Sequence, residues 1–207
     1  MRETSEFVRW SGLAALVAGV VTVVLDVADF ILTRDQLIDV AAVTSGWMVL
    51  HVSYLIADVL ILIALAGIWL HQAKQAAGLG VAGFLIAFAG TVMLASLEWS
   101  TAFLFPWIAK SAPGLLDTDP SGTAVAGFIV TFSLLVVGWI LFGVASLRAR
   151  VYPRGPVWLL ILGTIVVLVL GAADAPFLDV LWGLGLAWLG YGIWSGARET
   201  SDVTAGL

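Results

Sequence analysis

The chain of 207 residues is 61% hydrophobic and 11% charged, and its mean hydropathy is +1.08. Soluble domains are about half apolar and about a quarter charged, so these values exclude a water-soluble fold. The absence of cysteine excludes disulfides and thiolate metal sites, and a formal net charge of −5 argues against nucleic acid as a partner.

Six apolar runs along the chain are long enough to cross about 30 Å of hydrocarbon. They predict an all-α integral membrane bundle, a single membrane domain over 1–207 whose connectors are too short to form a second domain. The first run also resembles the apolar part of a signal peptide, but Asp26 and Asp29 would be unusual beside a cleavage site. The six predicted transmembrane helices are 10–31, 47–70, 79–105, 124–147, 157–173 and 177–194.

The Lys and Arg residues divide unequally between the two sides of this predicted bundle. Only Arg34 and Lys110 fall on the side away from the termini. Cytoplasmic loops of membrane proteins carry an excess of Lys and Arg, so the N and C termini are both predicted to be cytoplasmic. The basic residues on the side of the termini are Arg2, Arg9, Lys74, Arg148, Arg150, Arg154 and Arg198.

Ionisable residues inside the predicted spans are the candidate functional residues, because each costs several kcal/mol there unless it is neutral, paired or facing water. Counted at 1.5 Å per residue from the outer ends, His51, Asp26 and Glu98 share a layer about 6 to 10 Å deep. Asp58 lies about 16 Å deep, and His51 and Tyr54 share its helical face. We therefore predict a ligand- or proton-binding pocket among the first three helices, open to the outside, formed by Asp58, His51, Asp26, Glu98 and Tyr54.

The same residues allow two other interpretations. In the first, Asp58 is protonated and hydrogen-bonded, and these polar residues form a hydrogen-bonded core that has no function of its own. In the second, His51, Asp26 and Glu98 bind a divalent cation. Against this, the group has only one imidazole, and the sequence has no pair of histidines at a spacing typical of metal ligands. No cofactor is predicted, because the sequence has no phosphate-binding glycine loop, dinucleotide fingerprint or histidine-rich iron motif.

Three functions are compatible with this pattern. The leading hypothesis is that a small ligand or cation is bound or translocated with protonation of a carboxylate. The alternative is an intramembrane acid/base enzyme on a lipid or isoprenoid substrate, with Asp58 or Glu98 as general acid; the pattern leans against an enzyme and assigns no catalytic residue. The third is a structural or regulatory subunit without its own site, working as a homo-oligomer or with a partner membrane protein.

Small residues are expected where the helices contact one another. In lipid the hydrophobic effect does not drive helix association, and small residues allow the helices to approach closely. The expected positions are Gly83, Ala87 and Gly90 in the third predicted span and Gly185, Gly192 and Gly196 in the sixth.

Short motifs spread over nearly the whole chain resemble a broad group of small six-helix prokaryotic membrane proteins of unknown function. The resemblance implies six helices and a multi-pass location in the cytoplasmic membrane of a prokaryote, and it implies no activity or ligand. The motifs are WSGL at 10–13, LAGIWLH at 65–71, the run 83–98, FPW at 105–107, LRA at 147–149 and AWLGY at 187–191.

Overall fold

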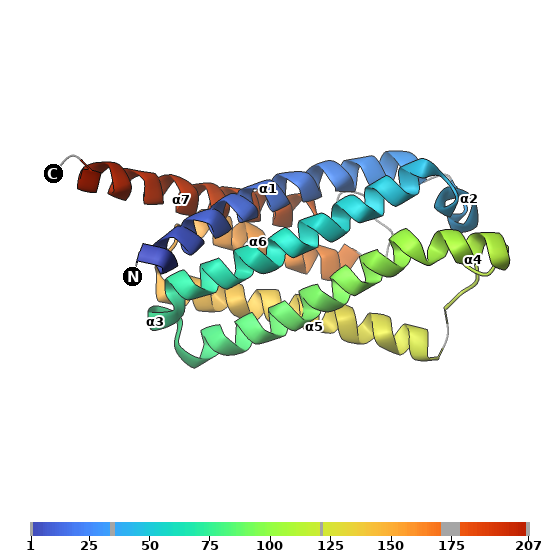
Figure 1. The fold of residues 1–207 in the computed structure, drawn as a ribbon. Coiled ribbons are helices and arrows are strands. Elements are labelled where there is room, and N and C mark those ends of the chain that lie inside the picture. The colour runs from blue at the N-terminus through green and yellow to red at the C-terminus, as the bar shows by residue number, and fades with distance from the viewer. Residues whose placement is uncertain (1, 34–35, 121, 171–178, 206–207) are drawn as a thin grey trace.

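The structure is a computed structural model, and it describes residues 2–33, 36–120, 122–170 and 179–205 (Figure 1). Over these residues the protein is all-helical and has no strand, which confirms the predicted all-α class. The helices are α1 (Arg2–Thr33), α2 (Ile38–Ala42), α3 (Ser45–Phe103), α4 (Phe105–Ser111), α5 (Thr123–Ala149), α6 (Arg154–Leu170) and α7 (Val180–Ala205).

The long helix α3 is folded into two antiparallel arms (Figure 1). A straight helix would separate Trp47 from Thr101 by about 80 Å at 1.5 Å per residue. Instead the Trp47 indole Nε1 donates a hydrogen bond of 2.8 Å to the carbonyl oxygen of Thr101. The reversal lies between the apolar stretches Ser45–Ala76 and Gly78–Phe103, here called the first and second arms of α3. The chain thus reverses within the segment 71–78 that separates the second and third predicted spans, although helical structure is assigned throughout α3.

Four helical stretches are long and apolar enough to cross a membrane, namely Ser5–Leu32, Ser45–Ala76, Gly78–Phe103 and Thr123–Ala149. They correspond to the first four predicted spans, and such helices are what a membrane-embedded protein requires. α6 contributes a shorter apolar stretch, Arg154–Val169. The predicted end of the fifth span and start of the sixth fall at 171–178, outside the described residues.

Two predicted connectors contain short helices that pack on one another at one end of the bundle. α2 lies within the connector 33–46, and α4 begins at Phe105, the last residue of the third predicted span, and continues into the connector 106–122. Each is too short to show a hydrophobic period. The N-terminus of α2 has no capping side chain of its own, and the Asp117 carboxylate accepts a hydrogen bond of 2.7 Å from the Ile38 N–H. In return, the carboxylate of Asp39 accepts a hydrogen bond from the backbone N–H of Gly114.

Both termini lie at the end of the bundle opposite α2 and α4 (Figure 1). A packed apolar core lies toward that end. Leu65 and Ile68 of α3, Phe142 of α5 and Leu186 of α7 are each at most 1% exposed there. Their burial in one apolar cluster stabilises the packing of α3 against α5 and of α7 against α1 and α6.

Small residues allow α3 and α5 to approach closely, as predicted for the third span. A Cβ atom added at Gly83 would lie 2.6 Å from the backbone nitrogen of Phe142, and one added at Gly90 would lie 2.5 Å from that of Leu135. Ala87 faces Gly138 of α5 and is fully buried. The predicted contacts of the third span are therefore confirmed.

The prediction for the sixth span was only partly correct. Gly185 packs against α6, where an added Cβ would lie 2.8 Å from the backbone nitrogen of Leu160. Gly192 and Gly196 have no neighbour within 4 Å of an added Cβ, so neither provides the expected contact. The close approach of α7 to α1 is instead made by Gly190, beside Leu16.

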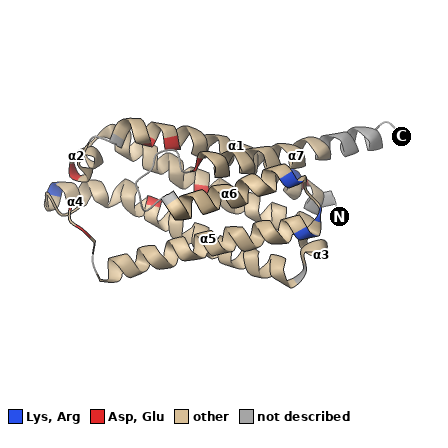
Figure 2. Ribbon diagram, turned by 180° about the vertical axis from the view of Figure 1, so that it is seen from behind, with Lys and Arg blue, Asp and Glu red and all other residues tan. Residues whose placement is uncertain are grey.

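Basic residues gather at the end of the bundle that holds the termini (Figure 2). Arg148 lies in the last turn of α5, Arg154 begins α6, and Lys74 lies close to the reversal of α3. Lys110 in the last turn of α4 lies at the opposite end. The two ends of the bundle therefore differ in charge.

Candidate functional site

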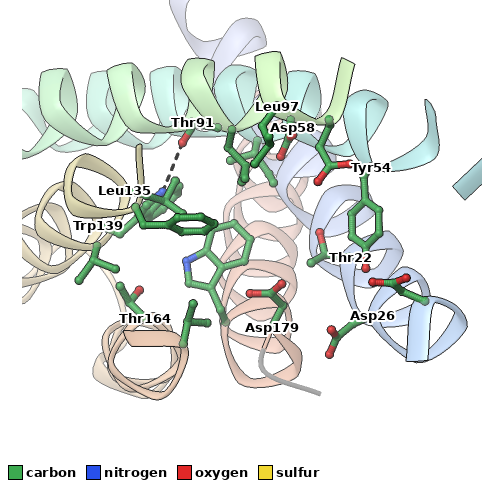
Figure 3. A pocket seen from close by; sticks show the side chains of 18 of the residues that line it. Thr22, Asp26, Tyr54, Asp58, Thr91, Leu97, Leu135, Trp139, Thr164 and Asp179 are labelled. Atoms are coloured by element: carbon green, nitrogen blue, oxygen red, sulfur yellow. Dashed lines mark hydrogen bonds between the residues drawn. The ribbon is translucent and has the colours of Figure 1, made fainter. Parts of the chain in front are cut away.

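A cavity of about 270 Å³ lies inside the bundle (Figure 3). Its wall is formed by α1, both arms of α3, α5, α6, Asp179 and the first turn of α7. The lining residues occur near the middle of each helix or in the half closer to α2 and α4, for example 22–29 in α1 and 91–98 in α3. The cavity therefore lies toward α2 and α4 and borders the apolar core, with which it shares Ile61 and Trp139.

All five residues predicted to bind a ligand or a proton line this cavity. Asp26 comes from α1, His51, Tyr54 and Asp58 come from the first arm of α3, and Glu98 comes from the second arm. The predicted pocket involved only the first three helices, whereas the cavity also involves α5, α6 and the start of α7. The structure therefore places the five residues together and enlarges the group that surrounds them.

The helical spacing of the first arm explains why three of these side chains point the same way. His51, Tyr54 and Asp58 follow one another at intervals of three and four residues, which places them on one helix face. The ring of His51 lies between those of Trp47 and Tyr54, at centroid distances of 4.3 Å and 6.2 Å. The imidazole therefore has a defined position at the cavity wall.

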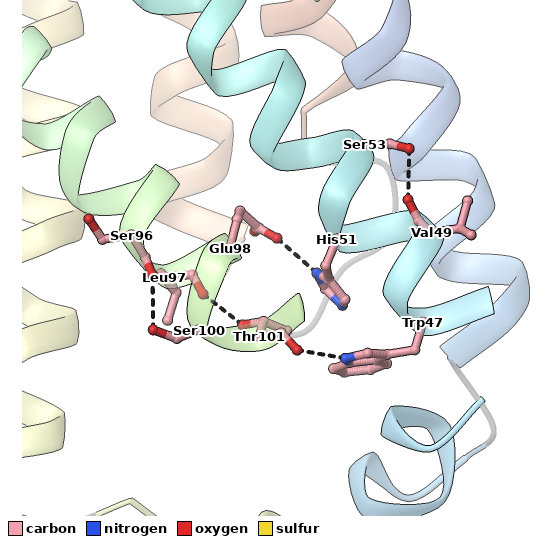
Figure 4. Close-up of polar contacts among 9 residues, drawn as sticks. All are labelled: Trp47, Val49, His51, Ser53, Ser96, Leu97, Glu98, Ser100 and Thr101. Carbon is pink, nitrogen blue, oxygen red and sulfur yellow. Dashed lines mark hydrogen bonds and ion pairs between the residues drawn. The ribbon is translucent and has the colours of Figure 1, made fainter. Parts of the chain in front are cut away.

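His51 also links the two arms of α3 (Figure 4). Its Nδ1 donates a hydrogen bond of 2.8 Å to the Glu98 carboxylate, and the two side chains are 11% and 18% exposed. Trp47 makes its hydrogen bond to Thr101 one turn closer to α2. Together these contacts fix the separation of the arms at the end where the cavity lies.

Asp58 is the deepest of the five predicted residues and is 4% exposed. Among the described residues its Oδ2 has no hydrogen-bond partner, and neither do Asp26 Oδ2, Thr22 Oγ1 and His51 Nε2. Buried polar atoms are nearly always hydrogen-bonded, so four buried atoms without partners around one cavity are unusual. The cavity wall thus offers hydrogen-bond acceptors and donors to a polar molecule that enters it.

The charge of the wall is strongly unbalanced. Five carboxylic side chains line the cavity, and among the described lining residues there is no Lys or Arg. His51 is the single basic side chain among them, and it already contacts Glu98. A low-dielectric cleft with one sign of charge attracts ions of the opposite sign, which here are cations. The five acidic residues are Asp26, Asp29, Asp58, Glu98 and Asp179.

The opposite side of the cavity is aromatic and apolar (Figure 3). The rings of Trp139 in α5 and Trp182 in α7 meet edge to face, with centroids 4.9 Å apart. Trp139 is 2% exposed, and its Nε1 donates a hydrogen bond of 3.4 Å to the Thr91 hydroxyl. Leu135 lies beside these groups. The cavity is therefore amphipathic, with an acidic side and an aromatic side.

The arrangement gives no support to a metal site. Within the described residues, no group of three or more His, Asp or Glu side chains could hold a metal ion. His51 and Glu98 meet, but Asp26 does not join them as a third ligand. The alternative of a divalent cation held by these three residues is therefore not carried further.

Sequence reasoning missed several residues of the cavity, and two of them left a signal. Trp139 lies near the middle of α5, and tryptophan in membrane helices is usually concentrated at the interfaces. A mid-span tryptophan therefore indicates an interior role. Asp179 is, like Asp26, a carboxylate near the end of a predicted span, which marks it as a candidate by the same criterion. Trp182 and Thr164 have no such distinguishing feature in the sequence.

Comparison with known proteins gives no match, since no family model, no curated protein and no solved structure matches this chain. The resemblance to small six-helix prokaryotic membrane proteins stays a prediction.

Proposed function

We propose that the protein is a multi-pass protein of a prokaryotic cytoplasmic membrane, with six spans and both termini on the cytoplasmic side. Four stretches of spanning length support the membrane location, and α6 and α7 supply the remaining two segments. The basic residues at the end of the termini support the orientation, because cytoplasmic ends carry the excess of Lys and Arg. In this orientation the cavity lies in the outer half of the membrane.

We further propose that the cavity binds or translocates a small cationic ligand, and that this step is coupled to protonation of Asp58. The observation that carries this proposal is the Asp58 carboxyl group, which is 4% exposed, lines the cavity and has one oxygen without a partner. An ionised carboxylate at this depth is costly unless it is paired. The empty site is therefore protonated, and a cation that enters takes the place of the proton as the partner of Asp58.

Release of a proton on binding tests this function. Purified protein in a weakly buffered detergent solution is mixed with the chloride salts of sodium, ammonium, tetramethylammonium and benzyltrimethylammonium, and a pH indicator follows the solution. A bound cation should release at most about one proton per chain, because one carboxyl group gives up its proton. The signal should saturate with concentration for the cation that binds.

Two aspartate variants control the measurement. Asp119→Asn changes an exposed loop residue that does not line the cavity. This variant should release as many protons on cation binding as the unaltered protein does. Asp58→Asn should release none, since an amide does not ionise. If none of the four cations releases a proton from the unaltered protein, the proposed coupling is wrong.

A further inference from the structure

We infer that the ligand is an organic ammonium ion with an apolar body, bound with its charged head among the carboxylates and its body against Trp139 and Trp182. This inference rests on the proposed function and specifies the substrate class of the same cavity. Three features of the cavity carry it: the position of the unpartnered carboxyl oxygens, the dispersal of the acidic groups, and the aromatic wall opposite them.

The acidic side sets the charge of the ligand. Asp58 and Asp26 each have one carboxyl oxygen that is buried and has no hydrogen-bond partner, and both residues line the cavity. The hydroxyl of Thr22 next to them is also without a partner. An ammonium group carries a positive charge and, where it bears N–H groups, donates hydrogen bonds to such oxygens. The chemistry at this side therefore suits a positively charged nitrogen.

The spacing of the acidic groups argues against a bare metal ion. The carboxylates are distributed over α1, both arms of α3 and the residue before α7, and no three of the described His, Asp and Glu side chains form a metal-binding group. Divalent metal ions take six to eight oxygen ligands at about 2.0 to 2.6 Å, which needs a dense cluster. An organic cation has a diffuse charge and no fixed coordination shell, so dispersed carboxylates suit it better.

The aromatic side sets the body of the ligand. Trp139 and Trp182 present their rings on the side formed by α5 and α7, and Phe132 and Val167 extend this surface over α5 and α6. Tryptophan rings bury a large area of apolar carbon and pack well against other aromatic rings. A hydrated inorganic ion would make no use of this wall, whereas a ligand with a hydrocarbon or aromatic body would be buried against it.

The two sides are separated across the cavity (Figure 3). Trp139 and Leu135 lie on one side, Tyr54 and Asp26 lie on the other, and Asp179 lies between them. The volume of about 270 Å³ is close to the lower limit of about 300 Å³ for typical small-molecule sites, so the ligand is small. A single charged head joined to one small apolar group matches this division.

Binding of matched probes to the purified full-length protein tests the inference. Benzyltrimethylammonium has both parts, tetramethylammonium has only the head, benzyl alcohol has a neutral polar end on the same ring, and sodium is a bare cation. Isothermal titration calorimetry should show benzyltrimethylammonium binding at least about tenfold more tightly than each of the other three. Benzyl alcohol should release no proton.

A variant of the aromatic side separates the head from the body. Trp182→Leu should weaken binding of benzyltrimethylammonium by about tenfold and leave that of tetramethylammonium within about twofold. Trp158→Leu is the matched control, because Trp158 of α6 is 50% exposed and does not line the cavity, and it should change neither. If Trp182→Leu does not fold, Val167→Phe serves instead, since filling the apolar side should exclude benzyltrimethylammonium but keep tetramethylammonium.

The outcomes distinguish this inference from the proposed function. If sodium or tetramethylammonium binds with proton release as tightly as benzyltrimethylammonium, the inference is wrong and the proposed function stands. Equal weakening of both ammonium probes by Trp182→Leu also overturns the inference, because the effect would then be structural. If no cation binds, both fail.

Discussion

Replacing Gly138 with leucine should strongly destabilise the bundle, seen as a large fall in thermal stability and a smaller monodisperse protein peak in detergent. A Cβ at Gly138 would overlap the backbone of Ala87 and lie 2.7 Å from the carbonyl carbon of Ile86 in α3. Backbone atoms have no rotamer that relieves such a contact, so α3 and α5 must separate. Overpacking of this kind costs about 1 to 3 kcal/mol and occasionally more. We expect the upper end of that range here.

A second glycine of the same helix provides the control. Gly127 of α5 is exposed, and a Cβ added there has no neighbour within 4 Å. Gly127→Leu should therefore leave thermal stability within about 0.5 kcal/mol of the unaltered protein. Equal stability of Gly127→Leu and Gly138→Leu would contradict the close packing of α3 against α5.

Replacing Asp58 with asparagine should abolish the pH dependence of cation binding and weaken the binding itself by at least about tenfold, or about 1.4 kcal/mol. In the unaltered protein the proton and the cation compete for one carboxylate, so affinity should rise with increasing pH until the carboxyl group is fully ionised and then level off. The amide that Asp58→Asn introduces neither ionises nor pairs with a cation by charge. Titration calorimetry at several pH values measures both effects.

Asp58→Leu separates this role from a purely structural one. If Asp58 only stabilises the fold as a buried hydrogen-bonding group, leucine should cost about 1 to 3 kcal/mol of stability. Because Asp58 Oδ2 has no hydrogen-bond partner in the part of the chain that the structure describes, we expect the Asp58→Leu protein to fold with unchanged or higher stability and to lose cation binding. Strong destabilisation by Asp58→Leu, together with normal cation binding by Asp58→Asn, would show that Asp58 is a hydrogen-bonded core residue with no role in binding.

The acidic side of the cavity could be predicted from the sequence because two simple regularities determine it. Charged residues are rare inside apolar helices, and helical spacing assigns them to faces, so His51, Tyr54 and Asp58 form one group from their spacing alone. Counting depth along the helix placed His51 and Glu98 in one layer, and the hydrogen bond between them confirms that they meet. These regularities depend only on the geometry of a single helix.

The aromatic side could not be predicted in the same way, because it depends on how helices pack. Trp182 and Leu135 are apolar residues in apolar helices, and nothing in their local sequence separates an inward face from a lipid-facing one. The same difficulty explains the error over Gly192 and Gly196, whose residue type suits a contact but whose face does not make one. In lipid, hydrophobicity is the same inside and outside a bundle, so the pattern that identifies a buried face in water is weak.

Accessibility of single cysteines tests the central claim, that an acidic cavity opens to the outer side of the membrane. The chain contains no cysteine, so each introduced thiol is unique. Thr22→Cys places a thiol at the cavity wall, and Val24→Cys places one on a 59% exposed face of the same helix, which lipid would cover. Gly114→Cys and Gly78→Cys mark the two ends of the bundle.

Intact cells that express each variant are treated with a membrane-impermeant cationic methanethiosulfonate or with its anionic analogue. We predict that the external reagent modifies Gly114→Cys and Thr22→Cys, the latter faster with the cationic form because the cavity is acidic, and leaves Gly78→Cys and Val24→Cys unmodified. Modification of Gly114→Cys without Thr22→Cys would show that the cavity is closed to the outside. Modification of Gly78→Cys without Gly114→Cys would show that the orientation is reversed, and either result would contradict the account.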